Sequence, residues 1–322
     1  LARILEKLDE LHLTDDTIVI FTSDNGPWMP AEGREGEWKR RYNGGMRGRK
    51  TEVDEGGVRV PLFIRWPGHI RPETKVTEIT AHVDLFPTLV ELCNVPMPET
   101  LPQDGLSLVP LLEGDAKDWP DRMIFTHQNQ LGDTRMTPGS VRTQQFRLVN
   151  RGEGYELYDM VADPGQKTDI ADQHPGVAQR LAAAYEAWYR DVTSRGTDAP
   201  RLPIGHPETA VVALQAEDST LDGGLKFRRK QGWAHDSVLN WGSRDDRVVW
   251  NIDVLQSGRY EITLLVGSGA ADVGKWVRIE AGGQSVEAQV SEAHDPMPTR
   301  KRAHDRAAVW TSGPVPIMTW IP

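Results

Sequence analysis

Residues 17–26 read TIVIFTSDNG, an apolar run that stops abruptly at the four residues SDNG. The β-branched and aromatic side chains of this run are typical of a strand that is buried on both faces of a parallel sheet. Asp24 and Asn25 follow directly, at the carboxyl end of the predicted strand, where ligands gather in open α/β sheets. A plain turn would explain the same residues, since Asp, Asn and Gly are standard turn formers.

A long segment rich in Gly, Arg and Lys follows and leads into a second apolar run at residues 61–66 (PLFIRW). It contains GGMRGRK at residues 44–50 and EGGVRVP at residues 55–61. Loops of this length are usually functional or disordered, and predicted strands tether this one at both ends. The segment therefore weighs against the plain-turn interpretation of Asp24 and Asn25.

Length, charge, hydropathy and cysteine content limit the class of protein to which the chain can belong. The 322 residues leave room for two or so domains, and the net charge of −10 argues against a general nucleic-acid binder, which would show a basic footprint. A mean hydropathy of −0.50 and the absence of a long apolar run argue against a membrane-spanning helix. The single cysteine, Cys93, excludes an internal disulfide, and we expect a buried thiol at a helix end.

Several motifs, taken in order, resemble the second half of the catalytic domain of a sulfatase, an arylsulfatase-like enzyme of the alkaline phosphatase-like superfamily. They are TSDNG at residues 22–26, Arg-x-x-Lys at 47–50, EGGVRVP at 55–61, WPG at 66–68, DLFPTL at 84–89, DGLSLVPLL at 104–112 and ELYD at 156–159. Several motifs in one order are more specific than any one of them. The resemblance implies a sulfuric ester hydrolase that acts on aryl or carbohydrate sulfates, and it favours a periplasmic or secreted location.

The resemblance also implies a set of site residues. Asp24 and Asn25 would bind Ca²⁺, or alternatively Mg²⁺, because carboxylate and amide oxygens are hard ligands, although two of them are too few for a complete site. Lys50 stands five residues before Glu55, as the family's lysine does before its Glu-Gly-Gly, which implies a catalytic role in neutralising a sulfate oxygen. Arg47 is a further substrate-binding candidate. We expect an ion pair between Arg59 and Glu55 to brace the loop.

The chain departs from the family pattern at the nucleophile. Sulfatases use a formylglycine made from the Cys or Ser of a Cys/Ser-x-Pro/Ala-x-Arg motif, and no such motif is present. The formylglycine and the remaining metal carboxylates are therefore expected upstream of Leu1, and we interpret the chain as a fragment that is inactive alone. In the complete form, the hydrated formylglycine would attack sulfur while Ca²⁺ and Lys50 stabilise charge on the sulfate oxygens.

We predict three parts along the chain. Residues 1–115 are expected to form the C-terminal part of a doubly wound α/β catalytic domain. Residues 116–204 are expected to form a small antiparallel α+β subdomain with a helix at residues 175–192. Residues 205–322 show the strand spacing of a jelly-roll-like β-sandwich and resemble carbohydrate-binding modules, although residues 312–322 lack a regular strand pattern where the sandwich should close.

Other functions stay open from the sequence. One is a phosphoesterase or sulfotransferring relative with the same metal ligands at the carboxyl end of the strand. The other is a non-catalytic chain whose sandwich binds glycan or another subunit. The predicted partner is a sulfated small molecule or glycan, with no nucleic acid and no membrane span, and an uncovered sheet surface predicts self-association. A basic cluster at residues 300–306 (RKRAHDR) is interpreted as a solvated loop, or as a further contact to an anionic substrate.

Overall fold

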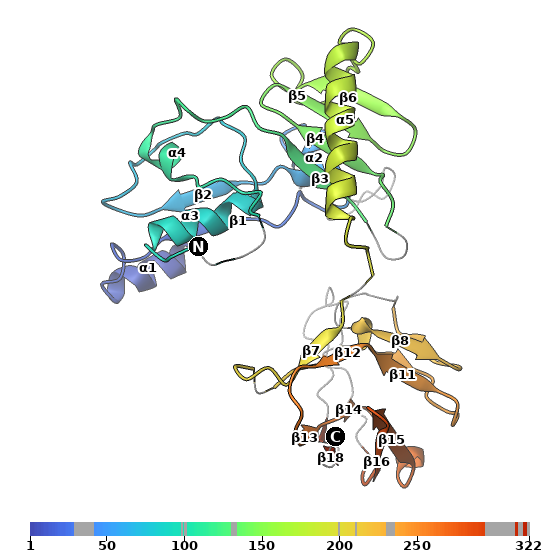
Figure 1. Ribbon diagram of the computed structural model, residues 1–322. Coiled ribbons are helices and arrows are strands. Elements are labelled where there is room, and N and C mark those ends of the chain that lie inside the picture. Colours follow the sequence, from blue (N-terminus) through green and yellow to red (C-terminus); the bar gives the residue numbers. More distant parts are fainter. Residues whose placement is uncertain are drawn as a thin grey trace. The chain divides into compact units, whose positions relative to one another are not determined.

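The computed structural model describes most of the chain as two compact units, Leu1–Thr197 and Asp198–Pro322 (Figure 1). The described residues are 1–28, 42–97, 99, 102–129, 134–198, 200–209, 211–229, 236–293, 313–314 and 318–320. No helix in this part of the chain is long and apolar enough to cross a membrane. The basic cluster at residues 300–306 lies outside the described residues.

The first unit begins with four short elements that frame the predicted site. They are α1 (Ala2–Glu10), β1 (Val19–Thr22), α2 (Glu55–Val58) and β2 (Leu62–Arg65). β1 ends one residue before Ser23, so the SDNG turn does follow the carboxyl end of a strand. Glu55 begins α2, and the second apolar run contains β2.

β1 differs from the predicted strand in its pairing and in its burial. It pairs antiparallel with β2, and the rings of Phe21 and Phe63 lie side by side with centroids 6.2 Å apart. These residues are 45% and 65% exposed. The prediction of a parallel strand buried on both faces is therefore wrong for this chain. An apolar run does not specify the direction or number of a strand's neighbours, and among the described strands only β2 pairs with β1.

The next segment contains η2 (His82–Asp84), α3 (Leu85–Leu92) and α4 (Val109–Glu113). The buried carboxylate of Asp84 accepts hydrogen bonds from the backbone N–H of Ala81 (2.7 Å) and Leu106 (2.9 Å), and from Arg122 Nη1 (2.7 Å). Asp84 thus joins the DLFPTL motif to the DGLSLVPLL motif. Cys93 lies just beyond α3 and is exposed, so the prediction of a buried thiol is wrong: α3 ends before the thiol reaches the core.

A four-stranded antiparallel sheet and one long helix complete the first unit. The elements are β3 (Ile124–His127), β4 (Gly139–Arg142), β5 (Phe146–Asn150), β6 (Tyr155–Asp159) and α5 (Pro175–Val192). The helix predicted at residues 175–192 is confirmed, and it packs against the sheet (Figure 1). The core between them contains Val141, Leu148, Leu157, Leu181 and Tyr185.

The other face of this sheet, named the polar face below, carries buried polar side chains beside a small apolar cluster of Val53, Val149, Tyr158 and Met160. Successive strand residues point to opposite faces, so Arg147 and Tyr158, which neighbour the core residues Leu148 and Leu157, point away from α5. The two residues are register partners across β5 and β6. This polar face meets the segment that leads into α2.

The second unit consists mainly of short paired strands. They are β7 (Leu202–Ile204), β8 (Ser219–Asp222), β9 (Lys226–Phe227), β10 (Val238–Leu239), β11 (Arg247–Trp250), β12 (Ile252–Val254), β13 (Tyr260–Ile262), β14 (Leu265–Val266), β15 (Trp276–Ala281), β16 (Gln284–Gln289), β17 (Gly313–Pro314) and β18 (Met318–Trp320). Each described strand of this unit pairs with one partner, and β12 with β7 is the parallel pair. The described pairs do not join into larger sheets, so the β-sandwich stays a prediction.

Candidate active site

The turn after β1 and the Lys50 loop, residues 43–57, are joined by their backbones. Gly26 N–H donates to the carbonyl of Gly57 at 2.8 Å, and Lys50 N–H donates to the carbonyl of Pro27 at 3.0 Å. A Cβ on Gly26 would lie 1.9 Å from the oxygen of Gly56, so only glycine allows this approach. The backbones of the SDNG turn and the Lys50 loop are therefore held together.

The Lys50 loop itself folds around the two glycines of α2. Gly56 N–H donates to the carbonyl of Arg47 at 2.7 Å, which closes the loop on the helix. A Cβ on Gly57 would meet the oxygen of Glu52 at 2.1 Å, and one on Gly56 would meet the oxygen of Gly48 at 2.5 Å. The Glu-Gly-Gly sequence is thus explained by close backbone packing.

Asp24 and Asn25 could provide oxygen ligands for a hard cation. Asp24 is exposed, and the amide nitrogen of Asn25 donates to the carbonyl of Gly26 at 2.9 Å, which fixes the amide plane and leaves its oxygen for a cation. Within the described residues, no group of three or more His, Cys, Asp or Glu side chains comes together to hold a metal. These two residues fit one side of a Ca²⁺ or Mg²⁺ site but do not complete it.

The two predicted cations of the loop lie in different surroundings. Lys50 is exposed, and no described residue pairs with its ammonium group. Arg47 Nη1 donates to the hydroxyl of Tyr158 at 2.8 Å and lies 3.7 Å from Glu156 Oε2. Arg47 therefore contacts the polar face of the sheet, and its substrate-binding role stays a prediction. The predicted ion pair between Arg59 and Glu55 is confirmed at 3.4 Å.

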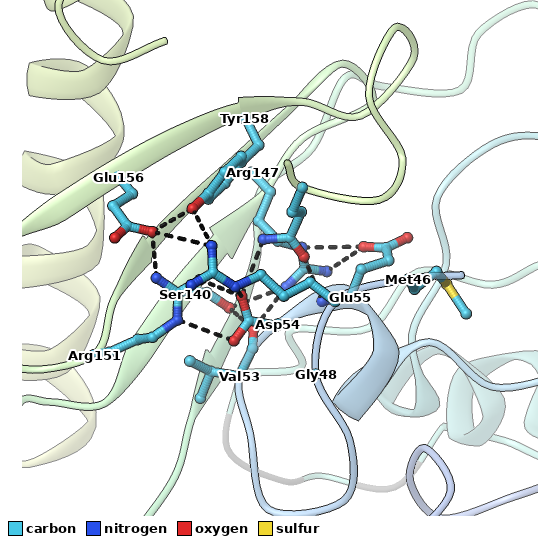
Figure 2. Close-up of polar contacts among 12 residues, drawn as sticks. Met46, Gly48, Val53, Asp54, Glu55, Ser140, Arg147, Arg151, Glu156 and Tyr158 are labelled. Atoms are coloured by element: carbon cyan, nitrogen blue, oxygen red, sulfur yellow. Dashed lines mark hydrogen bonds and ion pairs between the residues drawn. The ribbon is translucent and has the colours of Figure 1, made fainter. Parts of the chain in front are cut away.

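A buried ion pair between Glu55 and Arg147 is not predicted by the sequence (Figure 2). Arg147 Nε and Nη2 donate to Glu55 Oε2 at 3.0 and 2.7 Å. Arg142 lies 3.5 Å from the same oxygen. Burial alone would raise the pKa of Glu55, but the charges of Arg147, Arg142 and Arg59 outweigh burial, and the pKa lies below its usual value. Glu55 is thus an ionised carboxylate within the unit.

A second polar cluster lies beside this pair, as Figure 2 shows. Arg151 bridges the carboxylates of Asp54 and Glu156, with Arg151 Nε 3.1 Å from Asp54 Oδ2. Tyr158 OH donates to Glu156 Oε2, and burial together with this hydrogen bond raises the pKa of Tyr158 to about 12. Burial opposes the charge of Arg151, yet its hydrogen bonds to Asp54 and Glu156 raise its pKa overall. The ELYD motif thus faces the Lys50 loop through Glu156 and Tyr158.

Gln166 is a further residue that the sequence interpretation does not identify. It is buried, its Oε1 accepts the backbone N–H of Glu55 at 2.7 Å, and its Nε2 donates to Asp54 Oδ1 at 3.2 Å. Its φ of 53° is in the left-handed region, within a turn that begins at Asp163. The Asp-Pro-Gly sequence at residues 163–165 indicates that turn, but not its distant partners.

Family comparison covers the first unit. Residues 1–95 match the sulfatase family, and residues 49–186 match the C-terminal part of N-sulphoglucosamine sulphohydrolase. An N-acetylgalactosamine-6-O-sulfatase of Bacteroides thetaiotaomicron is 32% identical over 58% of this chain and 39% of its own length. Human steryl-sulfatase is 40% identical over 40% of this chain and 22% of its own length. Human arylsulfatase A is 35% identical over 50% of this chain and 30% of its own length.

The fold of the chain also resembles that of a solved structure. The crystal structure of Ps i-CgsB aligns with a TM-score of 0.50 at 21% identity, over 58% of this chain and 39% of that one. The chain spans between 22% and 39% of the length of the three relatives named above. Two overlapping family matches and three sulfatase relatives thus agree that residues 1–186 of the chain are similar to the sulfatase family.

Proposed function

We propose that the whole protein hydrolyses sulfate esters and that this chain supplies one side of its active site. The observation that carries the proposal is the pair of backbone hydrogen bonds from Gly26 to Gly57 and from Lys50 to Pro27. These bonds join the SDNG turn, which contains the candidate metal ligands, to the Lys50 loop. The sulfatase relatives support the reaction class at partial coverage. The nucleophile is proposed to come from a part of the protein outside these 322 residues, because the formylglycine motif is absent from them.

Each candidate residue has a distinct role in this proposal. The oxygens of Asp24 and Asn25 would hold Ca²⁺ together with carboxylates from elsewhere in the protein. The bound cation would stabilise negative charge on the sulfate group. The exposed ammonium of Lys50 would bind a sulfate oxygen and neutralise the charge that develops there, and backbone hydrogen bonds hold the main chain of the loop that carries it.

The substrate class is proposed to be a sulfated carbohydrate or an aryl sulfate. Relatives of both kinds occur among the matches, including the N-acetylgalactosamine-6-O-sulfatase and arylsulfatase A. Lys50 and Asp24 are both exposed, which suits a substrate that presents its sulfate group at the surface of the unit.

Hydrolysis of an aryl sulfate tests the proposal. The protein that carries this chain behind a formylglycine motif is expected to hydrolyse the ester, and Lys50→Ala is expected to lower kcat/KM by about 10²- to 10³-fold, as loss of one charge-stabilising group does elsewhere. Lys75→Ala, an exposed lysine of the same unit, is the matched control and should leave the rate unchanged.

The 322-residue chain alone is expected to be inactive on the same ester, even with added Ca²⁺. Wild-type rates in the Lys50→Ala enzyme would contradict the role of Lys50. Turnover by the isolated chain that disappears in Lys50→Ala would instead place the nucleophile within these residues.

A second candidate function concerns the second unit, where large aromatic side chains are exposed. Trp276 on β15 is 65% exposed and Trp241 is 46% exposed, and exposed aromatic faces commonly mark binding surfaces. The unit is proposed to bind glycan. Affinity electrophoresis in a sulfated polysaccharide is expected to show retardation that Trp276→Ala reduces. Val249→Ala, a smaller exposed apolar side chain, should not change it; equal migration of wild type and Trp276→Ala would exclude this function for Trp276.

A further inference from the structure

The Lys50 loop is anchored on the polar face of the four-stranded sheet as well as on the turn after β1. We propose that Arg147 and Gln166 are positioning residues, which hold this loop where Lys50 can meet a sulfate group beside Asp24. The inference rests on the proposed function, since it names the residues that set the geometry of the same anion site.

Arg147 fixes both the side chain and the backbone at the end of the loop. Two of its nitrogens donate to Glu55 Oε2, and the third, Nη1, donates to the carbonyl of Val53 at 3.0 Å and to Ser140 Oγ at 3.1 Å. Ser140 Oγ donates in turn to the same carbonyl at 2.9 Å. The guanidinium is rigid and buried, so it specifies direction as well as charge.

Gln166 independently anchors Asp54 and Glu55, the second of which also pairs with Arg147. It pairs with the backbone N–H of Glu55 and with the carboxylate of Asp54, and it reaches them from the turn after β6. The Asp54 carboxylate is also held by Arg151 from the end of β5. Residues 53–55 are thus bound on several sides by groups that lie more than eighty residues further along the chain.

The anchors are coupled to Lys50 through a short and tightly packed stretch. Gly56 N–H bonds to the carbonyl of Arg47, Glu52 N–H bonds to the carbonyl of Arg49, and Thr51 takes a φ of 76° between them. Backbone packed this closely cannot absorb a shift at one end without moving the other. A displacement of about 1 Å at a binding group can cost on the order of a hundredfold in rate, so the anchoring matters for the anion site.

Arg59 allows the effect of side-chain geometry to be distinguished from the effect of net charge. It pairs with the same Glu55 carboxylate, but from the next turn of its own segment, and its side chain is 62% exposed. Arg147→Lys keeps the charge and loses the planar fork. Arg59→Gln loses a charge and leaves the Arg147 fork in place. If geometry governs the site, Arg147→Lys is the harmful change; if net charge governs it, Arg59→Gln is.

The experiment measures how inorganic sulfate protects Lys50 from acetylation in the 322-residue chain, by mass spectrometry. Sulfate is expected to slow the acetylation of Lys50 and not that of Lys75. Arg147→Lys is expected to raise the half-protecting sulfate concentration roughly tenfold, in line with other groups that orient a binding residue. Gln166→Gly should do the same without backbone strain, because glycine favours the left-handed φ of this position. Arg59→Gln should change the concentration by less than about twofold, as expected for an exposed pair.

Amide hydrogen exchange of the same proteins tests the positioning role separately from sulfate binding, because it reports the order of the loop directly. Residues 47–57 should exchange faster in Arg147→Lys and Gln166→Gly, while α5 stays as protected as in the wild type. Lack of sulfate protection in the wild type would overturn the anion site itself. Unchanged exchange and protection in Gln166→Gly and Arg147→Lys would overturn the positioning role; if Arg147→Lys does not fold, Gln166→Gly decides alone.

Discussion

At the scale of single residues, Glu55 is the most constrained group of the site. Its carboxylate is nearly inaccessible to solvent and meets Arg147, Arg142 and Arg59 within 3.5 Å. A buried charge is tolerated only when it is paired, and here one anion is shared among three cations. Glu55 therefore holds the Lys50 loop in place through its ion pairs, a role that the glycine-rich motif alone does not indicate.

Glu55→Gln tests this role through stability. We expect the free energy of unfolding of the first unit to fall by about 3 to 5 kcal/mol at neutral pH, because Arg147 stays buried without its counterion. The folded-state pKa of Glu55 lies below the usual 4.5, so the contribution of the pair is fully present above that pH and is lost as the pH falls through the lower folded value. The difference between wild type and variant should therefore shrink on acidification, measured by urea-dependent hydrogen exchange of α5.

Glu52→Gln is the control for that experiment. Glu52 pairs with Arg49 at 2.9 Å but is 39% exposed, and exposed pairs contribute at most about 1 kcal/mol. A Glu55→Gln effect that is no larger, or that does not change with pH, would contradict the role given to the buried pair.

The sequence predicts the residues of this site unevenly. Asp24, Asn25 and Lys50 stand inside short motifs, and local spacing is enough to nominate them. Arg147 and Gln166 cannot be found in this way, because they meet Glu55 across 92 and 111 residues. In a single sequence, Arg147 is only one polar residue in the short strand FRLVN, residues 146–150.

At the scale of elements, α2 depends on its two glycines. Gly57→Ala would place a Cβ 2.1 Å from the oxygen of Glu52 and 2.5 Å from that of Arg49, and both are backbone atoms that cannot rotate away. We expect a loss of about 1 to 3 kcal/mol, the usual cost of overpacking, together with faster amide exchange over residues 47–57.

Gly176→Ala in the first turn of α5 is the matched control. Apart from its chain neighbours and the backbone of its own helix, no heavy atom of the described residues lies within 4 Å of the position that a Cβ would take here. Alanine favours a helix over glycine, so the unit should gain up to about 1 kcal/mol. Equal thermal unfolding of the Gly57→Ala protein and the wild type would mean that the loop can move away from α2.

The elements also differ in how well the sequence predicts them. The helix at residues 175–192 is predicted at its observed bounds, because its apolar stripe repeats at the helical period and buries Leu181 and Tyr185. β1 is predicted in place but with the wrong neighbours, because strand partners are chosen by the whole sheet.

At the scale of the whole molecule, large apolar side chains remain exposed on the first unit. Exposed residues of this kind include Leu1, Ile4, Leu11, Phe21 and Phe63. Exposed apolar surface promotes association. We expect the isolated chain to self-associate or to bind a hydrophobic dye, measured by solution scattering and dye fluorescence. Phe63→Ser should reduce the signal, whereas Val161→Ser, an exposed residue elsewhere, should not. A compact monomer that binds no dye would contradict the prediction.

The long sequence separation between the Lys50 loop and its anchors has a consequence for synthesis. Glu55 leaves the ribosome 111 residues before Gln166, which supplies one of its hydrogen bonds. At the usual elongation rate this delay lasts roughly 6 to 22 seconds. Until the later strands emerge, the nascent loop lacks the described contacts of its carboxylate to β5 and of its backbone to the Gln166 turn. The Lys50 loop is therefore translated early and acquires its final order late.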